Sequence, residues 1–236
     1  MLQTVFKSIV VPLRDFIYPP VCFTCDRLLN ENESRVCAVC WDSLERLQPD
    51  HPAQIEIRKK FKSEELVQDL LSCFLFEKEG KLQEIVQLLK YGGIRSLGVR
   101  LGKEIGERIQ NNSEFASSDY LIPVPLHKLK QRERGYNQSE YLCRGISELT
   151  GIPVHTSLMV RNKYTESQTQ LDIEQRQKNV GGAFAINPKR RLSVQAKSFI
   201  IVDDVITTGS TINACASVLR RGGASVVYAA SAALAK

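Results

Sequence analysis

Two neighbouring carboxylates followed by a hydroxyl-rich loop are the residues best suited to chemistry in this sequence. Asp203 and Asp204 directly follow the apolar run 199–202, and the next residues are Thr207, Thr208, Gly209, Ser210 and Thr211. Free N–H groups at a helix N-terminus and short hydroxyl side chains bind phosphate, and a glycine lets the backbone approach it closely. Carboxylates at a strand end accept hydrogen bonds from ribose hydroxyls or hold Mg²⁺ through water. The segment therefore predicts a sugar-phosphate site.

The pattern of this loop differs from two other phosphate-binding patterns. It lacks the lysine of a Walker motif, and the chain has no G-x-G-x-x-G fingerprint of a dinucleotide site. The alternative is a strand that ends in two solvated aspartates before an ordinary N-capped helix.

A second candidate site for anions follows the strand expected at residues 120–124. Its side chains are four cations within seven residues and two polar neighbours: Lys128, Lys130, Arg132, Arg134, Tyr136 and Asn137. Because the preceding strand can lie beside the strand of Asp203, we expect this basic loop to contact pyrophosphate. A solvated basic loop is the alternative. Asn137 or Ser139 is expected to cap the helix that follows.

A long polar stretch at residues 161–179 contains Gln168, Arg176 and Asn179. Long polar loops of this kind close over reactive ligands in many enzymes, so the stretch is expected to be a mobile lid. A plain surface loop is the alternative.

Four of the seven cysteines form two C-x2-C pairs that are 11 residues apart: Cys22, Cys25, Cys37 and Cys40. Four thiolates surround one Zn²⁺ tetrahedrally and leave no position for water, so the spacing predicts structural zinc. A module of about 30 residues has too small a hydrophobic core to fold alone, so a bound metal ion is expected to stabilise it. Buried or redox cysteines are the alternative. Asp26 and Trp41 occupy positions where a glycine often accommodates the turn, and tryptophan fits a positive φ poorly.

Composition restricts the class of protein. The 236 residues are 43% hydrophobic and 25% charged, which is typical of a globular chain, and the net charge of +6 mildly favours phosphate-bearing partners. The longest uncharged stretches have 15 and 14 residues, fewer than the ~18 of a spanning helix. The first residues include Lys7, Arg14 and Asp15 and no small-residue cleavage site, so we expect a cytoplasmic protein.

The sequence predicts four parts. Residues 1–18 place apolar side chains at helical spacing around Pro12, which favours a short docking helix; a membrane-surface helix is the alternative. Residues 19–50 are the zinc-finger or zinc-ribbon module, and residues 51–71 are a linker helix. The basic cluster of this helix is expected to be a solvated face and consists of Arg58, Lys59, Lys60 and Lys62. The remaining part is a large domain at 72–236.

Strands and helices alternate in the large domain. Strands are expected near 73–76, 120–124, 183–186, 198–202 and 225–230, and helices near 81–90, 97–110, 139–149 and 212–219. Strands that alternate with helices predict an α/β fold with a parallel sheet and helices on both faces.

The segment 199–211 closely resembles the ribose-phosphate motif of the type I phosphoribosyltransferases, in which apolar residues and two acids precede Thr-Gly-x-Thr. The resemblance implies a phosphoribosyltransferase fold and 5-phosphoribosyl 1-pyrophosphate (PRPP) with Mg²⁺ as the ligand. It places residues 207–211 on the 5′-phosphate and Asp203 and Asp204 on the ribose hydroxyls. Asp204 is also a candidate acid or base towards a nucleophile.

The four-cysteine module, the helix end at Tyr91-Gly92-Gly93 and the segment 134–138 (Arg-Gly-Tyr-Asn-Gln) extend the resemblance. With the acidic pair, they make nearly the whole chain resemble the ComF family of competence proteins. That family implies a role in natural transformation, in which incoming single-stranded DNA is handled on the cytoplasmic side of the membrane. It also implies a helicase-like ATPase as a partner, and association with the inner face of the membrane is a further expectation.

Two functions are open at this point. In the first, the domain is a binding module whose basic residues contact the phosphates of single-stranded DNA while Tyr136 stacks on a base. In the second, it is an active phosphoribosyltransferase of nucleotide metabolism or salvage with an unknown acceptor. Mg²⁺ and the basic loop would then neutralise pyrophosphate, the aspartates would stabilise the ribosyl centre, and the lid would exclude water.

Overall fold

The computed structural model describes residues 19–162 and 182–235 of the chain. These residues fall into two compact units, and the division lies between Leu44 and Glu45. Within the described ranges, no helix is long and apolar enough to cross a membrane. The docking or membrane-surface helix expected at 1–18 lies outside the described residues.

The first unit has little regular structure. Isolated β-bridges join Val21 to Leu28 and Ser34 to Val36. A short helix, α3 (Ala38–Asp42), begins after Cys37, whose sulfur accepts a hydrogen bond from the N–H of Cys40. With so few backbone ladders, this unit depends on its cysteines for stability.

The second unit is built on a four-stranded parallel sheet. Its strands are β1 (Leu70–Phe76), β2 (Tyr120–Pro123), β5 (Ser198–Ile206) and β6 (Val226–Ala235), in the spatial order β1-β6-β5-β2. All three pairings are parallel, so the carboxyl ends of the strands meet at one edge. A separate antiparallel pair joins β3 (Met159–Arg161) to β4 (Phe184–Ile186).

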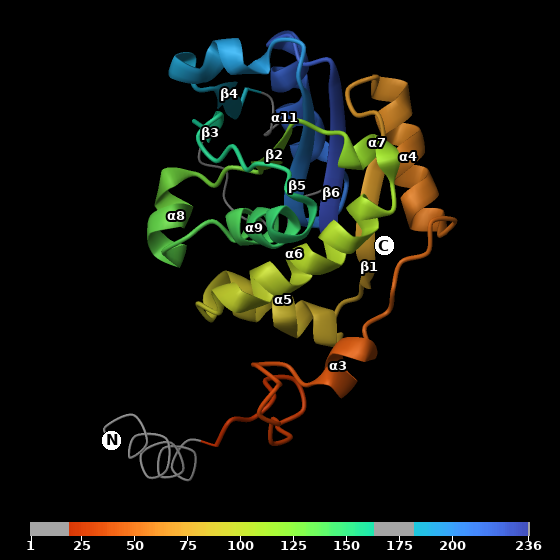
Figure 1. Cartoon of the computed structure of the whole chain (residues 1–236), viewed down its shortest axis with the longest axis vertical. Coiled ribbons are helices and arrows are strands. Elements are labelled where there is room, and N and C mark those ends of the chain that lie inside the picture. Colours follow the sequence, from red (N-terminus) through yellow and green to blue (C-terminus); the bar gives the residue numbers. More distant parts are fainter. Residues whose placement is uncertain (1–18, 163–181, 236) are drawn as a thin grey trace. The chain divides into compact units, whose positions relative to one another are not determined.

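Helices pack against both faces of the sheet (Figure 1). Phe199 and Ile201 of β5 belong to a core cluster with Phe61 and Ile212 from helices α4 and α11. Ile200 and Val202 are also fully buried, and because side chains alternate along a strand they point to the other face. That face is covered by α6 and α9. The helices of this unit are α4 (Pro52–Glu64), α5 (Lys81–Tyr91), α6 (Arg95–Gln110), α7 (Ser113–Ala116), α8 (Lys128–Arg134), α9 (Gln138–Thr150) and α11 (Ser210–Arg221), with the 3-10 helix η2 (Pro188–Val194).

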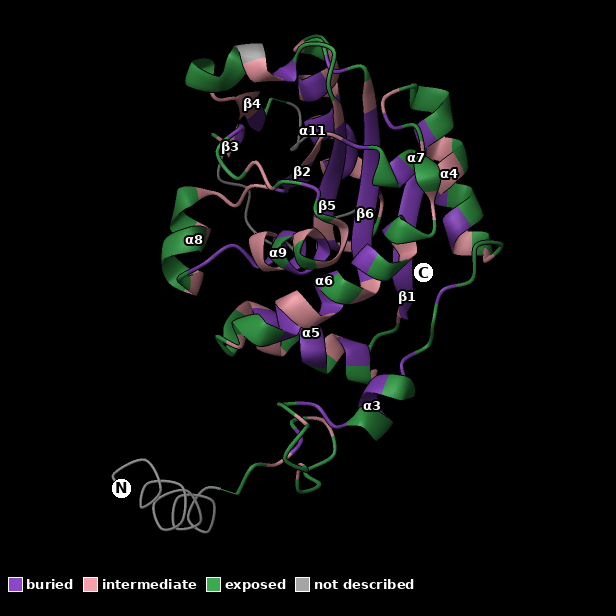
Figure 2. Ribbon diagram, in the orientation of Figure 1, coloured by how far each residue is buried: buried purple, intermediate pink, exposed green. Residues whose placement is uncertain are grey.

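The burial pattern confirms the predicted architecture. Figure 2 shows β5 and β6 buried along most of their length, as expected of parallel strands with helices on both sides. The hydrophobic run of β6 therefore needs no alternation with polar residues.

Two glycines bring α6 and α9 unusually close together. A Cβ atom on Gly102 would lie 2.2 Å from the carbonyl oxygen of Leu142, and one on Gly145 would lie 2.1 Å from that of Val99. A side chain at either position would force the helices apart. The two helices therefore pack backbone against backbone at these positions.

Two expectations about the elements were wrong, and the strand expected near 183–186 is present but outside the parallel sheet. The basic segment after β2 is helix α8 rather than a loop, because His127 Nδ1 accepts the N–H of Leu129 at its start and Gly135 ends it at φ 79°. Strand β5 continues to Ile206, because Asp203 and its successors still pair with β6. The strand near 183–186 is β4, which pairs with β3 and not with the parallel sheet.

Candidate functional site

The two aspartates lie in the last residues of β5 and contact different elements. Asp204 is only 4% exposed, and its Oδ2 lies 2.9 Å from Nζ of Lys90 at the end of α5. Asp203 Oδ1 accepts a hydrogen bond of 3.3 Å from Oγ of Ser139 in the first turn of α9. Strand β5 and helices α5 and α9 therefore converge on the acidic pair.

The surroundings shift the pKa values of Asp203 and Lys90. Burial raises the pKa of Asp203 to about 7, and the charge of Asp204 adds to the rise. Burial acts to lower the pKa of Lys90, but the charges of Asp204 and Asp203 outweigh it and the pKa is raised. At neutral pH Lys90 is therefore charged, while Asp203 titrates near neutrality.

The hydroxyl-rich loop lies between β5 and α11. Gly209 adopts the left-handed conformation at φ 74° and precedes the first turn of α11 without capping it by a side chain. The N–H of Ser210 makes a long 3.5 Å hydrogen bond to Oγ1 of Thr208, and Gly209 itself provides no side-chain cap for the N–H groups that follow. Oγ1 of Thr208 and Oγ of Ser210 lie 2.8 Å apart, with Thr207 before them and Thr211 in the first turn of the helix. The arrangement suits a phosphate monoester.

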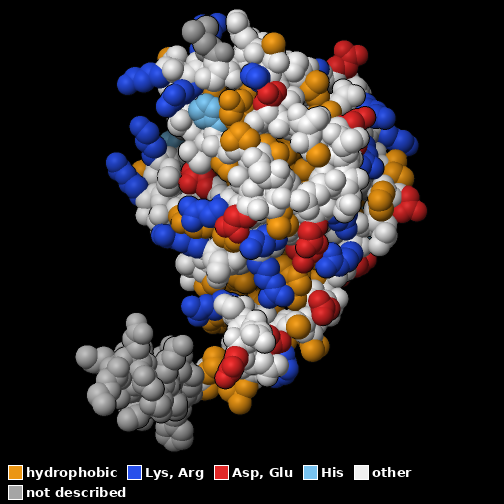
Figure 3. Space-filling view, viewed as in Figure 1, with side chains coloured by type: hydrophobic (Ala, Val, Ile, Leu, Met, Phe, Trp, Pro, Cys, Tyr) orange, Lys and Arg blue, Asp and Glu red, His pale blue; other side chains and the backbone are white. Residues whose placement is uncertain are grey.

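Helix α8 divides the four predicted cations into two sets. Residues four apart share a helix face, so Lys130 and Arg134 lie together and Lys128 and Arg132 lie on another side. Lys130 and Arg134 line a pocket of about 240 Å³ with Glu133 of α8. Lys90 and Tyr91 at the end of α5, and Gly93 just after it, complete the lining. Lys128 and Arg132 are exposed. In Figure 3, Lys and Arg side chains gather along the side of the molecule that carries α8.

Contacts within this pocket hold its wall in place. The guanidinium of Arg134 lies 5.2 Å from the ring centre of Tyr91 and donates a 2.7 Å hydrogen bond to Oε1 of Gln138. Burial lowers the pKa of Lys130, and the charges of Arg161 and Arg134 lower it further. This electropositive pocket therefore favours an anionic ligand.

The structure corrects the role expected of Tyr136. Its side chain is 6% exposed, its hydroxyl donates to the carbonyl oxygen of Leu89, and its ring packs edge-on against Tyr141 at 5.4 Å. A ring enclosed in this way has no free face for a nucleobase. Tyr91, which is 70% exposed, is the aromatic side chain at the pocket.

Asn137 has a structural role at the turn between α8 and α9. Its Oδ1 accepts the N–H of Ser139, which caps α9, and its Nδ2 donates to the carbonyl oxygen of Val124. Asn137 is buried and thereby ties the start of α9 to the residue after β2. The lid residues Gln168, Arg176 and Asn179 lie outside the described residues.

Sequence reasoning assigned no site role to Lys90 and gave Lys60 only a solvated one. Lys90 is the last lysine before a Gly-Gly helix end, and a lysine near a helix C-terminus is common without any function. Lys60 lies in a basic cluster whose members look alike in sequence, yet its Nζ donates to the carbonyl oxygen of Thr208 at 2.6 Å. A pairing between distant segments leaves no local signal.

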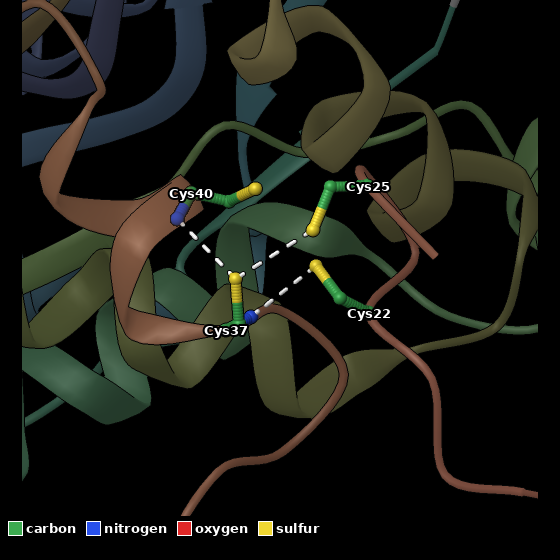
Figure 4. A group of neighbouring side chains, drawn as sticks. All are labelled: Cys22, Cys25, Cys37 and Cys40. Carbon is green, nitrogen blue, oxygen red and sulfur yellow. Dashed lines mark hydrogen bonds between the residues drawn. The ribbon is translucent and has the colours of Figure 1, made fainter. Parts of the chain in front are cut away.

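The four cysteines of the first unit converge (Figure 4). Their sulfur atoms all lie within 4.8 Å of one another, and those of Cys25 and Cys37 are 3.8 Å apart. Tetrahedral zinc with Zn–S bonds of about 2.3 Å requires sulfur separations of roughly 3.8 Å. Asp26 adopts φ 55°, as expected of the turn, whereas Trp41 lies in helix α3 and needs no positive φ. The cluster therefore fits one structural Zn²⁺.

Hydrogen bonds from the backbone favour the ionised form of two of these thiols, Cys22 and Cys37. The N–H of Cys37 donates to Sγ of Cys22 at 3.3 Å. Burial acts to raise the pKa of Cys22, but this hydrogen bond and those from Thr24 and Cys25 lower it to about 6. A thiolate near neutral pH is the form that binds zinc.

Two family models match separate parts of the chain, a zinc ribbon in the first unit and a phosphoribosyltransferase domain in the second. A family model described as a double zinc ribbon domain matches residues 13–53, and one described as a phosphoribosyl transferase domain matches residues 146–236. The described cysteines of the first match suffice for one zinc ion.

Curated relatives confirm the resemblance to the ComF family. The chain is 37% identical over 103 residues to Competence protein F of Haemophilus influenzae, which is 44% of each chain. It is 36% identical over 109 residues to DNA utilization protein YhgH of Escherichia coli K12, 46% of each. It is 27% identical over 103 residues to Competence protein ComFC of Bacillus subtilis, 44% of this chain and 39% of that protein. The matches span less than half the length of these relatives.

Solved structures with a similar arrangement are more distant. Glutamine PRPP amidotransferase from B. subtilis is 22% identical with a TM-score of 0.40, over 61% of this chain and 30% of that one. Phosphoribosylpyrophosphate synthetase from Mycobacterium smegmatis is 19% identical with a TM-score of 0.32, over 56% of this chain and 33% of that one. The domain assignment therefore depends on the family model.

Zinc removal is expected to unfold the first unit alone. Trp41 is the single tryptophan and is buried next to Cys40, so its fluorescence reports on this unit. Chelation, or Cys37→Ser, should reduce bound zinc from one ion per chain to almost none and shift the Trp41 emission to the red. Cys143→Ala, which removes a buried thiol of the second unit, should leave the zinc content unchanged. Equal zinc loss in both variants would contradict the assignment.

The raised pKa of Asp203 predicts a pH-dependent effect of Asp203→Asn on stability. A carboxyl whose pKa is higher in the folded than in the unfolded state destabilises the fold once it must ionise. For Asp203 this destabilisation begins near the unfolded pKa of about 3.9, grows as pH rises, and is complete above the folded pKa of about 7. Asp203→Asn should therefore raise the melting temperature at pH 8 and change it little at pH 4.5. Melting of both proteins without ligand, at several pH values, measures this difference. A difference that is the same at both pH values would refute a raised pKa.

Proposed function

We propose that this chain acts in natural transformation, in the handling of incoming single-stranded DNA, through a domain that binds PRPP with Mg²⁺. The observation that carries the proposal is the meeting of three features at the carboxyl end of β5. These are the acidic pair, the hydroxyl-rich loop that starts α11, and the cationic pocket between α5 and α8. The names of the relatives, a competence protein and a DNA utilization protein, support the biological role.

Each part of PRPP has a matching group in this arrangement. Residues 207–211 would hold the 5′-phosphate, and Asp203 and Asp204 would accept hydrogen bonds from the ribose hydroxyls. Lys130 and Arg134 would contact the pyrophosphate. Mg²⁺ would supply further neutralisation of the pyrophosphate charge, and the carboxylate oxygens of Asp203 suit it through water.

Single-stranded DNA would bind through the same side of the molecule. Lys128 and Arg132 on the exposed side of α8 supply charges for its phosphates, and Tyr91 offers an exposed ring for a base. A helicase-like ATPase and the inner face of the membrane are the further partners that we propose.

Phosphoribosyl transfer is a second candidate function, favoured by one observation. Asp203 has a pKa of about 7, which suits proton exchange with an acceptor at neutral pH. Asp204 is committed to Lys90 instead, so Asp203 is the better candidate for the acid or base.

Calorimetric titration of Mg²⁺ and PRPP tests the ligand. Wild-type protein should bind PRPP, and Asp203→Asn/Asp204→Asn should weaken binding at least about tenfold, which corresponds to about 1.4 kcal/mol. Lys128→Ala, on the exposed side of α8, is the matched control and should bind normally. A wild-type protein that does not bind PRPP would remove this ligand from the proposal.

Fluorescence anisotropy with labelled oligothymidine tests the DNA contact. Tyr91→Ala should weaken binding by about tenfold through the loss of one stacked base, while Tyr91→Phe retains the ring and the affinity. The binding constant K falls as salt rises. Arg132→Ala should make the slope of log K against log salt less steep by about 0.7, whereas Tyr91→Ala should leave that slope unchanged.

An abasic strand provides the control for stacking. It keeps the phosphates and lacks the bases, so wild type and Tyr91→Ala should bind it equally. Equal affinity of the two proteins for oligothymidine would exclude Tyr91 as the stacking residue.

A further inference from the structure

Helix α4 contacts the loop 207–211 and the first turns of α11 at three points. Nζ of Lys60 donates to the carbonyl oxygen of Thr208 at 2.6 Å. The ring of Phe61 fills the space beside Gly209, where a Cβ atom would lie 2.7 Å from Cε1. Oε2 of Glu64, one turn further along α4, accepts a 2.6 Å hydrogen bond from Nδ2 of Asn213. The loop is therefore held from outside by one helix.

Lys60 differs from the other lysines of its helix. Lys59 and Lys62 are exposed, whereas Lys60 is half-buried and reaches the loop. Its sequence neighbours thus share its charge but not its position.

The position of this ammonium group matters because of the peptide that it contacts. The oxygen of Thr208 and the nitrogen of Gly209 belong to one peptide group, so Nζ of Lys60 lies within about 5 Å of the nitrogen of Gly209. That N–H belongs to the group of donors expected to face a phosphate. A positive charge at this distance favours an anion on the loop, and the effect decreases with salt.

The loop and the first turns of α11 contain no cation of their own. Residues 205–219 carry no charged side chain, and the cations of α11, Arg220 and Arg221, lie in its last turn. Within this segment a bound phosphate would therefore meet only N–H and hydroxyl groups. Helix α4 also precedes residues 146–236, which the phosphoribosyl transferase model matches. A lysine from outside the matched segment would complete the charge balance of this subsite.

We propose that Lys60 is a positioning residue of the sugar-phosphate subsite, which sets the loop conformation and supplies its positive charge towards phosphate monoesters. This inference rests on the proposed function, because it assumes that the loop 207–211 holds the 5′-phosphate. Ribose 5-phosphate is the simplest probe of the subsite, and inorganic pyrophosphate probes the pocket between α5 and α8 separately.

Calorimetry with these two probes and PRPP tests the role of Lys60. Lys60→Met, which keeps most of the aliphatic chain, should weaken the binding of ribose 5-phosphate and PRPP by about tenfold and leave the binding of pyrophosphate unchanged. Lys60→Arg should retain most of the affinity because it keeps the charge. The difference between wild type and Lys60→Met should shrink as salt increases. Lys59→Met removes the same charge from the exposed neighbour and should bind all three ligands normally.

Several results would overturn the inference. One is an affinity of Lys60→Met for ribose 5-phosphate that equals the wild-type affinity. Another is a loss of this affinity in Lys59→Met that is as large as the loss in Lys60→Met. An equal loss of affinity for ribose 5-phosphate and for pyrophosphate would show general damage to the domain and not a role of Lys60 at the loop. If Lys60→Met did not fold, Lys60→Gln would be used for the same comparison. A wild-type protein that binds neither PRPP nor ribose 5-phosphate would overturn the proposed ligand itself, which distinguishes that failure from a failure of Lys60.

Discussion

Lys90 and Asp204 form an ion pair at the carboxyl end of β5, with Nζ and Oδ2 2.9 Å apart and side chains that are 24% and 5% exposed. Removing Lys90 would leave the buried carboxylate of Asp204 without its cation, which destabilises a fold. The pair therefore holds the end of α5 against β5. Tyr91 and Gly93 follow Lys90, and all three line the cationic pocket together with residues of α8.

The two aspartates of this strand end have different environments although they are neighbours in sequence. Alternation along β5 directs Asp204 to Lys90, whereas Asp203 contacts Ser139 of α9 and lacks a cation at ion-pair distance among the described residues. Burial and the second carboxylate therefore raise the pKa of Asp203 to about 7. Two identical side chains are thereby suited to two roles, with Asp204 held in a charge pair and Asp203 able to change protonation at neutral pH.

The candidate site combines a phosphoribosyltransferase motif with residues from earlier segments of the chain. The matched model covers β5 and α11, while Lys60, Lys90 and Arg134 come from α4, α5 and α8 before it. A fold of this kind supports many functions, and the side chains added around it decide which ligand is bound. The cations around the acidic pair favour phosphate-rich ligands, a property shared by PRPP and by DNA.

Local patterns in the sequence predicted most of the helices and strands, the four clustered cysteines and the loop 207–211. The period of the apolar residues predicted α5, α6, α9 and α11, because one helix face must be buried, and the C-x2-C spacing brings sulfur atoms together by short turns alone. Only the tertiary structure decided which cations act together, because α8 turns Lys130 and Arg134 to the pocket and Lys128 away. It also buried Tyr136 and brought Lys60 and Lys90 to segments more than 100 residues away in sequence. These contacts arise from the packing of helices on a sheet, so the residues next to Lys60, Lys90 and Tyr136 in sequence do not predict them.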